Sequence, residues 1–137
     1  MSRLAAIFAL AMIVSPSLAA PDTQEPEVLG ILFYADWCGS CKILEPEVDK
    51  ARGKANLDNE PVLFVRLDLT DATRRHQAAM LASSLGIGDF FDRNAGATGF
   101  MLLVDAESKE VISTLTKKSD AAAITEQVKA AIRKAAG

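Results

Sequence analysis

The stretch YADWCGSCK, residues 34–42, holds Cys38 and Cys41, the two cysteines of this 137-residue chain. It follows the apolar run VLGILFY, residues 28–34, which predicts a strand buried on both faces of a sheet. A helical pattern then runs from Cys38 to about Gly53, with Pro46 inside it as a kink. Its expected inward residues are Ile43, Leu44, Val48 and Ala51. The cysteine pair therefore stands where a buried strand passes into a helix.

The rest of the chain predicts a mixed sheet with helices on both faces. The segments with strand or helix patterns are a strand at 62–69, a helix at 71–86, a hairpin of strands at 100–104 and 110–115, and a final helix at 120–135. Residues 87–98 are expected to form a loop that buries Phe90 and Phe91. The residues expected to face inward from the later helices are Ala79, Met80, Leu85, Ile124, Val128 and Ile132.

Residues 1–19 have the pattern of a secretory signal peptide. Arg3 is the positive n-region, Leu4–Val14 is the apolar core, and Ser17-Leu18-Ala19 is a small-x-small cleavage signal. As a membrane anchor the apolar stretch is short, because spanning a bilayer takes about 20 residues. We expect cleavage after residue 19 or 20, a flexible lead-in over residues 20–27, and one domain over residues 28–137. After cleavage, a periplasmic or secreted protein without stable membrane insertion is expected.

The charge pattern argues against a nucleic-acid partner. The chain has 15 basic and 18 acidic side chains and a net charge of −3, and these charges are scattered along the sequence. No basic stripe and no alternation of basic with aromatic residues is present. Nucleic acid is therefore not expected as a partner.

The spacing of Cys38 and Cys41 fits a structural disulfide, part of a metal site, or a redox pair. A disulfide is expected to form in an oxidising compartment, but so short a loop gains little chain entropy. Structural zinc needs four nitrogen or sulfur donors, and the chain adds only His76, in a polar run where a solvated side chain is expected. No metal site is predicted, with copper(I) at the two thiolates kept as an alternative.

The redox interpretation assigns the two cysteines different roles. A sulfur at a helix start meets unpaired N–H groups and the positive end of the helix dipole, which favours the thiolate of Cys38. Cys41, one turn along the helix, is placed to attack a mixed disulfide formed on Cys38. Trp37 is expected to cover the pair and offer a docking surface, with an ordinary core tryptophan as the alternative, and Asp36 is a candidate for tuning the thiols.

FYADWCGSCK, residues 33–42, resembles the active-site segment of the thioredoxin superfamily. Pro46 matches the kink proline of the family's active-site helix, residues 99–112 resemble its final hairpin, and the terminal helix fits as well. The wording Y-A-D-W-C is most similar to the periplasmic reducing domain of DsbD-type proteins. The resemblance covers about residues 28–135. It implies a thioredoxin-like α/β fold, with a mixed central sheet flanked by helices and a helix-plus-loop insertion before the final hairpin.

Two positions depart from the family pattern. Leu32 stands where thioredoxins carry a buried aspartate, and Gly99 stands where they carry a cis-proline. We expect the Thr98–Gly99 peptide bond to be trans, because a cis bond before a residue other than proline costs about 2.5–4 kcal/mol. Glycine also predicts a more open wall opposite the cysteines, with its N–H free to reach Cys38 or a substrate carbonyl.

The resemblance implies a thiol–disulfide oxidoreductase that reduces protein disulfides. Its redox-active disulfide would be Cys38–Cys41, with no other cofactor, and its partners would be protein dithiols and disulfides bound by a monomer. Residues expected to dock substrate or tune the pair are Trp37, Asp36, Gly39, Ser40, Thr98 and Gly99. The chief alternative is a copper(I)- or thiol-binding module without turnover. A second alternative is an interaction module with a structural disulfide.

Overall fold

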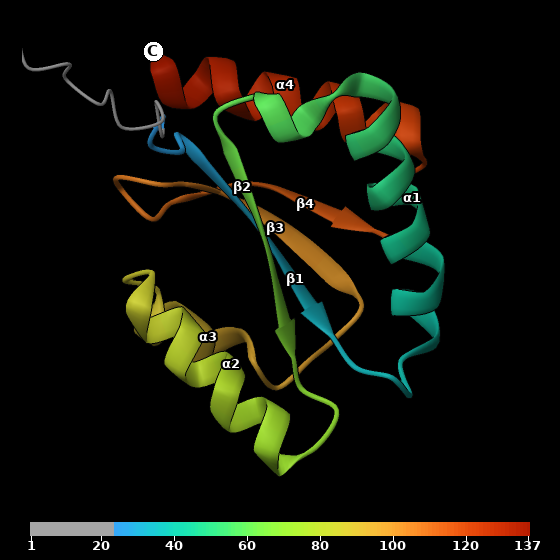
Figure 1. Ribbon diagram of the computed structural model, residues 1–137, viewed down its shortest axis with the longest axis vertical. Helices are drawn as coiled ribbons and strands as arrows, with labels where there is room; N and C mark the ends of the chain where they lie inside the picture. The colour runs from blue at the N-terminus through green and yellow to red at the C-terminus, as the bar shows by residue number, and fades with distance from the viewer. Residues whose placement is uncertain (1–23) are drawn as a thin grey trace, which may run out of the picture.

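The computed structural model of the protein describes residues 24–137. Its elements run along the chain as β1 (Val28–Tyr34), α1 (Gly39–Ala55), the short 3-10 helix η1 (Leu57–Asn59), β2 (Val62–Asp68), α2 (Ala72–Ser84), α3 (Gly88–Asn94), β3 (Phe100–Asp105), β4 (Val111–Thr116) and α4 (Ala121–Ala136) (Figure 1). The predicted leader and residues 20–23 of the predicted lead-in lie outside the described residues. Within residues 24–137, no helix is both long and apolar enough to cross a bilayer.

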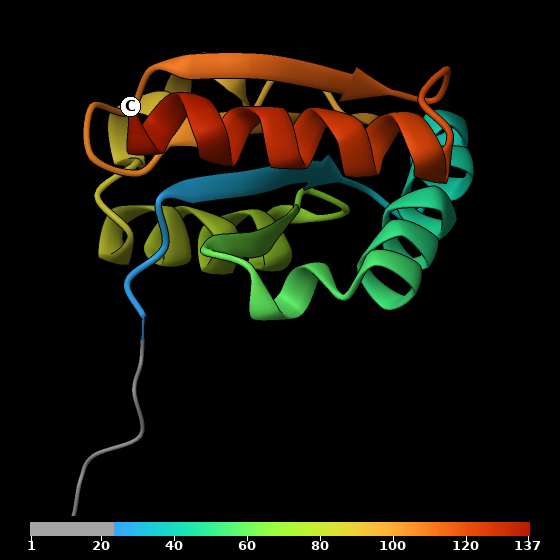
Figure 2. The same ribbon diagram turned by 90° about the horizontal axis from the view of Figure 1, so that it is seen from above.

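The four strands form one mixed sheet in the order β2-β1-β3-β4. β1 pairs in parallel with β2 and antiparallel with β3, and β3 pairs antiparallel with β4 in the predicted hairpin. Helices α1 and α4 cover one face of the sheet, and α2 and α3 cover the other (Figures 1 and 2). The predicted fold class is confirmed.

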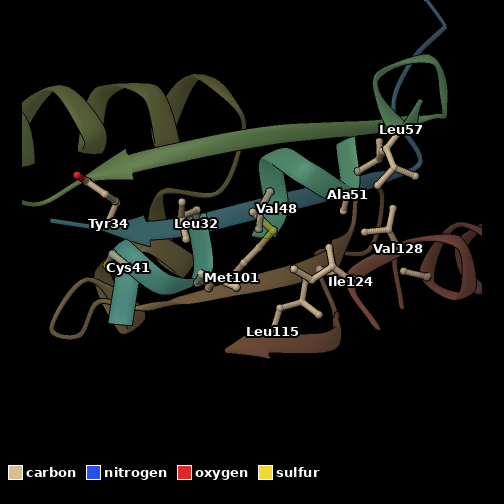
Figure 3. Packing of buried hydrophobic residues seen from close by; sticks show 14 of the residues in the cluster. Leu32, Tyr34, Cys41, Val48, Ala51, Leu57, Met101, Leu115, Ile124 and Val128 are labelled. Atoms are coloured by element: carbon tan, nitrogen blue, oxygen red, sulfur yellow. The ribbon is translucent and has the colours of Figure 1, made fainter. Parts of the chain in front are cut away.

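β1 is the strand that both layers of helices bury. Because strand side chains alternate, successive residues of β1 enter opposite cores. Val28, Leu32 and Tyr34 face the core of α1 and α4, and Leu29, Ile31 and Phe33 face the core of α2 and α3. The first core also contains Cys41 (Figure 3). The cysteine pair is thereby built into the packing between the central strand and α1.

The predicted loop at 87–98 is wrong over Gly88–Asn94, which forms the helix α3. Phe90 and Phe91 are each 5% exposed, as their apolar character predicted. The Phe90 ring lies 6.5 Å from that of Phe33, in the core below β1. A backbone drawn this close to the core must satisfy its own hydrogen bonds, and a short helix does so. Helices α2 and α3 together occupy the insertion predicted before the hairpin.

Two residues predicted to face inward are exposed instead. Ile43 is 52% exposed on α1 and Met80 is 62% exposed on α2. Helix α2 buries Ala78 and Ala82, which are four positions apart on one face. The alanines around Met80 left the periodicity of this segment weak, so the pattern placed the buried face at the wrong angle.

Helix α4 should lose stability when its N-terminal cap is removed. The Asp120 side chain accepts a hydrogen bond of 2.8 Å from the Ala123 N–H, and the helix buries Ile124 and Val128 completely, with Ile132 half-buried. Asp120→Ala is expected to lower the free energy of unfolding by about 1 kcal/mol. Asp120→Asn retains the acceptor and is expected to lose less. Urea unfolding of both variants makes the comparison, and equal losses would contradict the capping explanation.

Candidate active site

Cys38 is the N-cap residue of α1. Its backbone is extended, with φ −83° and ψ 108°, and its Sγ accepts the N–H of Cys41 at 3.2 Å. The Cys38 N–H itself donates to the Ala35 carbonyl at 3.0 Å, which fixes the turn between β1 and the helix. The sulfur therefore occupies the position of a capping oxygen, at the positive end of a 17-residue helix.

The two cysteines differ in depth. They form a disulfide with a Cα–Cα distance of 5.3 Å, in which Cys38 is 7% exposed and Cys41 is 0% exposed. The Sγ of Cys41 lies 3.7 Å from the carbonyl oxygen of Phe33, inside the core. A partner arriving from solvent can reach only Cys38, so the asymmetry that the sequence predicted for the pair is present in its geometry.

Gly99 faces the pair from the start of β3. Its φ is +92°, and an added Cβ would lie 3.2 Å from the Cys38 Sγ and 2.7 Å from the Ser40 Cβ. The expectation of an open wall is wrong at this point, because Ser40 and Cys38 already fill the space. Proline, whose φ is fixed near −65°, cannot replace Gly99 without rebuilding the backbone.

The N–H of Gly99 is also not free for a substrate. It donates to the Phe33 carbonyl at 2.8 Å, so the predicted bond to Cys38 or to a substrate carbonyl is wrong. Thr98 lies directly before it, half-buried. The peptide bonds of residues 24–137 are all trans, which confirms the expectation for Thr98–Gly99.

Trp37 and Asp36 stand at the rim of the site. Trp37 is 67% exposed, which rules out the core-tryptophan interpretation, and its Nε1–H donates to the Thr70 carbonyl at 3.1 Å. The Asp36 carboxylate accepts the Tyr34 hydroxyl at 3.2 Å and lies 3.6 Å from Arg74. Tuning of the thiols by Asp36 stays a prediction. Burial first, and the hydrogen bond to Asp36 second, raise the pKa of Tyr34.

The remaining predicted positions divide between the surface and the pair. Gly39 is exposed and has open space where a side chain would stand, whereas Ser40 is half-buried against Gly99. The structure thus brings Cys38, Cys41, Ser40 and Gly99 together.

The side of the pair that faces the sheet is apolar. Leu32 is 4% exposed and belongs to the same core as Cys41, opposite Met101 of β3 (Figure 3). Among residues 24–137 no charged or polar side chain is buried. The described part of the chain also has no group of three or more His, Cys, Asp or Glu side chains placed to hold a metal, and His76 is exposed on α2. Copper(I) at the two cysteines alone stays an untested alternative.

Thr70 contributes to the site and was missed from the sequence. It follows β2, and it binds both the Asp36 N–H and the Trp37 indole. A signal was present, because the carboxyl ends of parallel strands lie at the same edge of a sheet. Because β1 and β2 are parallel neighbours, the polar residues after β2 lie beside the segment that leads to Cys38.

Gly99 should tolerate no side chain. Gly99→Ala is expected to lower the free energy of unfolding of the oxidised protein by about 2 kcal/mol or more, since the positive φ alone costs about 1–2 kcal/mol and the methyl group meets Ser40. Gly96→Ala is the matched control, because an added Cβ there has open space, and its change should stay within about 0.5 kcal/mol. Urea unfolding measures both; equal stability of the two variants would contradict the contact with Ser40.

The comparisons with known proteins agree with this geometry. The thioredoxin family matches residues 22–83. Protein disulfide-isomerase of Oryctolagus cuniculus is 27% identical over 119 residues, covering 83% of this chain and 22% of that protein. Protein disulfide-isomerase of Gallus gallus is 30% identical over 98 residues, covering 68% of this chain and 18% of that protein. The chain thus spans about a fifth of the length of these relatives.

One solved structure supports the fold. The solution structure of a candidate protein disulfide isomerase from Bacteroides thetaiotaomicron superposes with a TM-score of 0.53 at 21% identity, covering 80% of this chain and 76% of that one. The family match includes β1, the cysteine pair and α1, which are the elements that build the site. The chain belongs to the thioredoxin superfamily.

Proposed function

We propose that this protein is an exported thiol–disulfide oxidoreductase that reduces disulfides in other proteins. The observation that carries the proposal is the unequal depth of the pair, with Cys38 at 7% exposure capping α1 and Cys41 at 0% exposure behind it. A disulfide that serves only stability needs no such difference. The arrangement fits a nucleophile that meets the partner and a resolving thiol that the partner cannot reach.

The reaction begins from the reduced pair. The Cys38 thiolate, stabilised by the Cys41 N–H and the helix dipole, attacks one sulfur of the partner's disulfide and displaces the other sulfur as a thiolate. Cys41 then gives up its proton, attacks the Cys38 sulfur of the mixed disulfide, and releases the second partner thiolate. Two electrons pass from the dithiol to the partner, and a donor dithiol must reduce Cys38–Cys41 again.

The residues around the pair supply position rather than charge. Leu32 lies in the apolar core beside Cys41, and no carboxylate is buried among residues 24–137 to receive the Cys41 proton. We therefore assign this proton transfer to water that enters during exchange. Gly99 and Ser40 close one side of Cys38, and Trp37 stands exposed on the rim. No diffusible cofactor takes part in this scheme.

The location and the direction of electron flow rest on the sequence. The leader pattern of residues 1–19 favours export, and the similarity of Y-A-D-W-C to the reducing domain of DsbD-type proteins favours reduction. The relatives named above are protein disulfide-isomerases, which supports protein disulfides as the substrate class. In the periplasm, such a reductase must draw its electrons from an upstream dithiol.

The two cysteines should trap substrate unequally. Cys41→Ala keeps the nucleophile and removes the resolving thiol. It is therefore expected to accumulate a mixed disulfide with insulin, which non-reducing gels detect. Cys38→Ala retains only a thiol that solvent cannot reach, and it is expected to trap almost nothing. Both variants should lose dithiothreitol-driven insulin reduction.

The wild-type protein is the reference for this experiment. Equal trapping by both variants would contradict the assignment of Cys38 as nucleophile. Absence of insulin reduction by the wild type, together with stoichiometric copper(I) binding that both substitutions abolish, would contradict the proposed activity and favour the binding module.

A further inference from the structure

The turn after β2 is hydrogen-bonded to the turn that leads into Cys38. Thr70 is the half-buried residue at the centre of this contact, and it uses its side chain and its backbone together. Its Oγ1 accepts the Asp36 N–H at 2.9 Å, and its carbonyl oxygen accepts the Trp37 Nε1–H at 3.1 Å. One residue therefore holds two consecutive residues that directly precede the nucleophile.

Asp68 sets the direction of the Thr70 hydroxyl. Its Oδ1 accepts both the Thr70 N–H at 3.0 Å and the Thr70 Oγ1–H at 2.5 Å. Because the hydroxyl proton points to Asp68, a lone pair of the oxygen is directed at the Asp36 N–H. Burial would raise the pKa of Asp68, but the two bonds from Thr70 and the charges of Arg66 and Arg74 outweigh it and lower the pKa. The carboxylate is thus kept as an acceptor at neutral pH.

Ion pairs reinforce the contact only weakly. Arg74 lies 3.6 Å from Asp36, 3.8 Å from Asp68 and 2.9 Å from Asp71, and its side chain is 46% exposed. Exposed pairs of this kind contribute about 0–1 kcal/mol each. The directional hydrogen bonds of Thr70 are the more specific constraint on the turn.

The consequence falls on Trp37. At 67% exposure its ring has few neighbours to fix it, and the bond from Nε1 to the Thr70 carbonyl is a directional restraint on the indole. An exposed aromatic ring that is held in place offers contact area without the entropy cost of ordering a mobile side chain. It also lies next to Cys38 in the sequence.

We propose that Thr70 is a positioning residue that holds Trp37 as a fixed platform for protein disulfides beside Cys38. The inference rests on the proposed function. A protein substrate presents a surface around its disulfide that can rest on the indole, whereas a small disulfide needs only the sulfur of Cys38. Thr70 therefore acts on the affinity for protein substrates and not on sulfur exchange itself.

The test replaces the hydroxyl while keeping the shape of the side chain. Thr70→Val removes the two bonds of the hydroxyl, from the Asp36 N–H and to Asp68, and keeps the two backbone bonds, from the Thr70 N–H to Asp68 and from Trp37 to the Thr70 carbonyl. Without the hydroxyl, the carbonyl that accepts the indole N–H is expected to be held less firmly. Thr70→Ser retains all four bonds. Thr73→Val, at an exposed position in the first turn of α2, is the matched control. Since Trp37 is the one tryptophan of the chain, acrylamide quenching of its fluorescence reports the platform directly.

Thr70→Val is expected to increase the quenching of Trp37 and to raise the KM for insulin about fivefold, the factor that corresponds to one lost hydrogen bond. The rate of the reduced protein with hydroxyethyl disulfide should stay within about twofold, as for exchange limited by Cys38 alone. Thr70→Ser and Thr73→Val should behave as the wild type in all three measurements.

Two results would overturn the inference. Unchanged quenching in Thr70→Val would mean that the Thr70 hydroxyl does not fix the carbonyl that holds the indole, so the side chain would have no positioning role. Changed quenching with an unchanged KM would mean that the platform plays no part in binding protein substrates. If Thr70→Val does not fold, Trp37→Phe, which keeps a ring but loses the indole N–H, must raise the KM for insulin in the same way. A wild type that does not reduce insulin would instead refute the proposed function, and the quenching comparison would still test the restraint.

Discussion

The carbonyl oxygen of Phe33 is the point at which three segments of the chain meet. It belongs to the central strand β1, accepts the Gly99 N–H at 2.8 Å, and lies 3.7 Å from the Cys41 Sγ. The first contact fixes where β3 begins relative to the cysteines. The second sets the depth of Cys41 on α1. Because β1 is buried by helices on both faces, this oxygen cannot shift without disturbing both cores. The packing of the central strand therefore determines where the disulfide lies.

The two sides of Cys38 are held by opposite means. On one side Gly99 approaches closely because it has no side chain, and a single methyl group there would collide with Ser40. On the other side Thr70 holds Asp36 and Trp37 through directional hydrogen bonds. The first restraint is steric and permits almost no substitution. The second depends on polar groups near solvent, so we expect substitutions there to disturb the packing of the core less.

Sequence patterns predicted the elements whose signals are local. The apolar run before the cysteines fixed β1, and Cys38 at a strand-to-helix junction was predicted correctly as the start of α1. Patterns failed where the outcome depends on tertiary contacts. Alanine-rich α2 gave no clear inward face, and α3 forms because Phe90 must reach the core. The hydrogen bond from the Gly99 N–H to the Phe33 carbonyl could not be predicted from the family pattern, because it joins residues far apart in the chain.

The depth of Cys41 also bears on how the pair withstands oxidants. A peroxide that reaches the site meets Cys38 first, since Cys41 is 0% exposed, and converts it to a sulfenic acid. With Cα atoms 5.3 Å apart, Cys41 can condense with that sulfenic acid and expel water to give the intramolecular disulfide. The second oxidation, to the sulfinic acid that cellular dithiols cannot reverse, must compete with this unimolecular step. The buried thiol of Cys41 thus converts the sulfenic acid of Cys38 into the Cys38–Cys41 disulfide, which a dithiol can reduce.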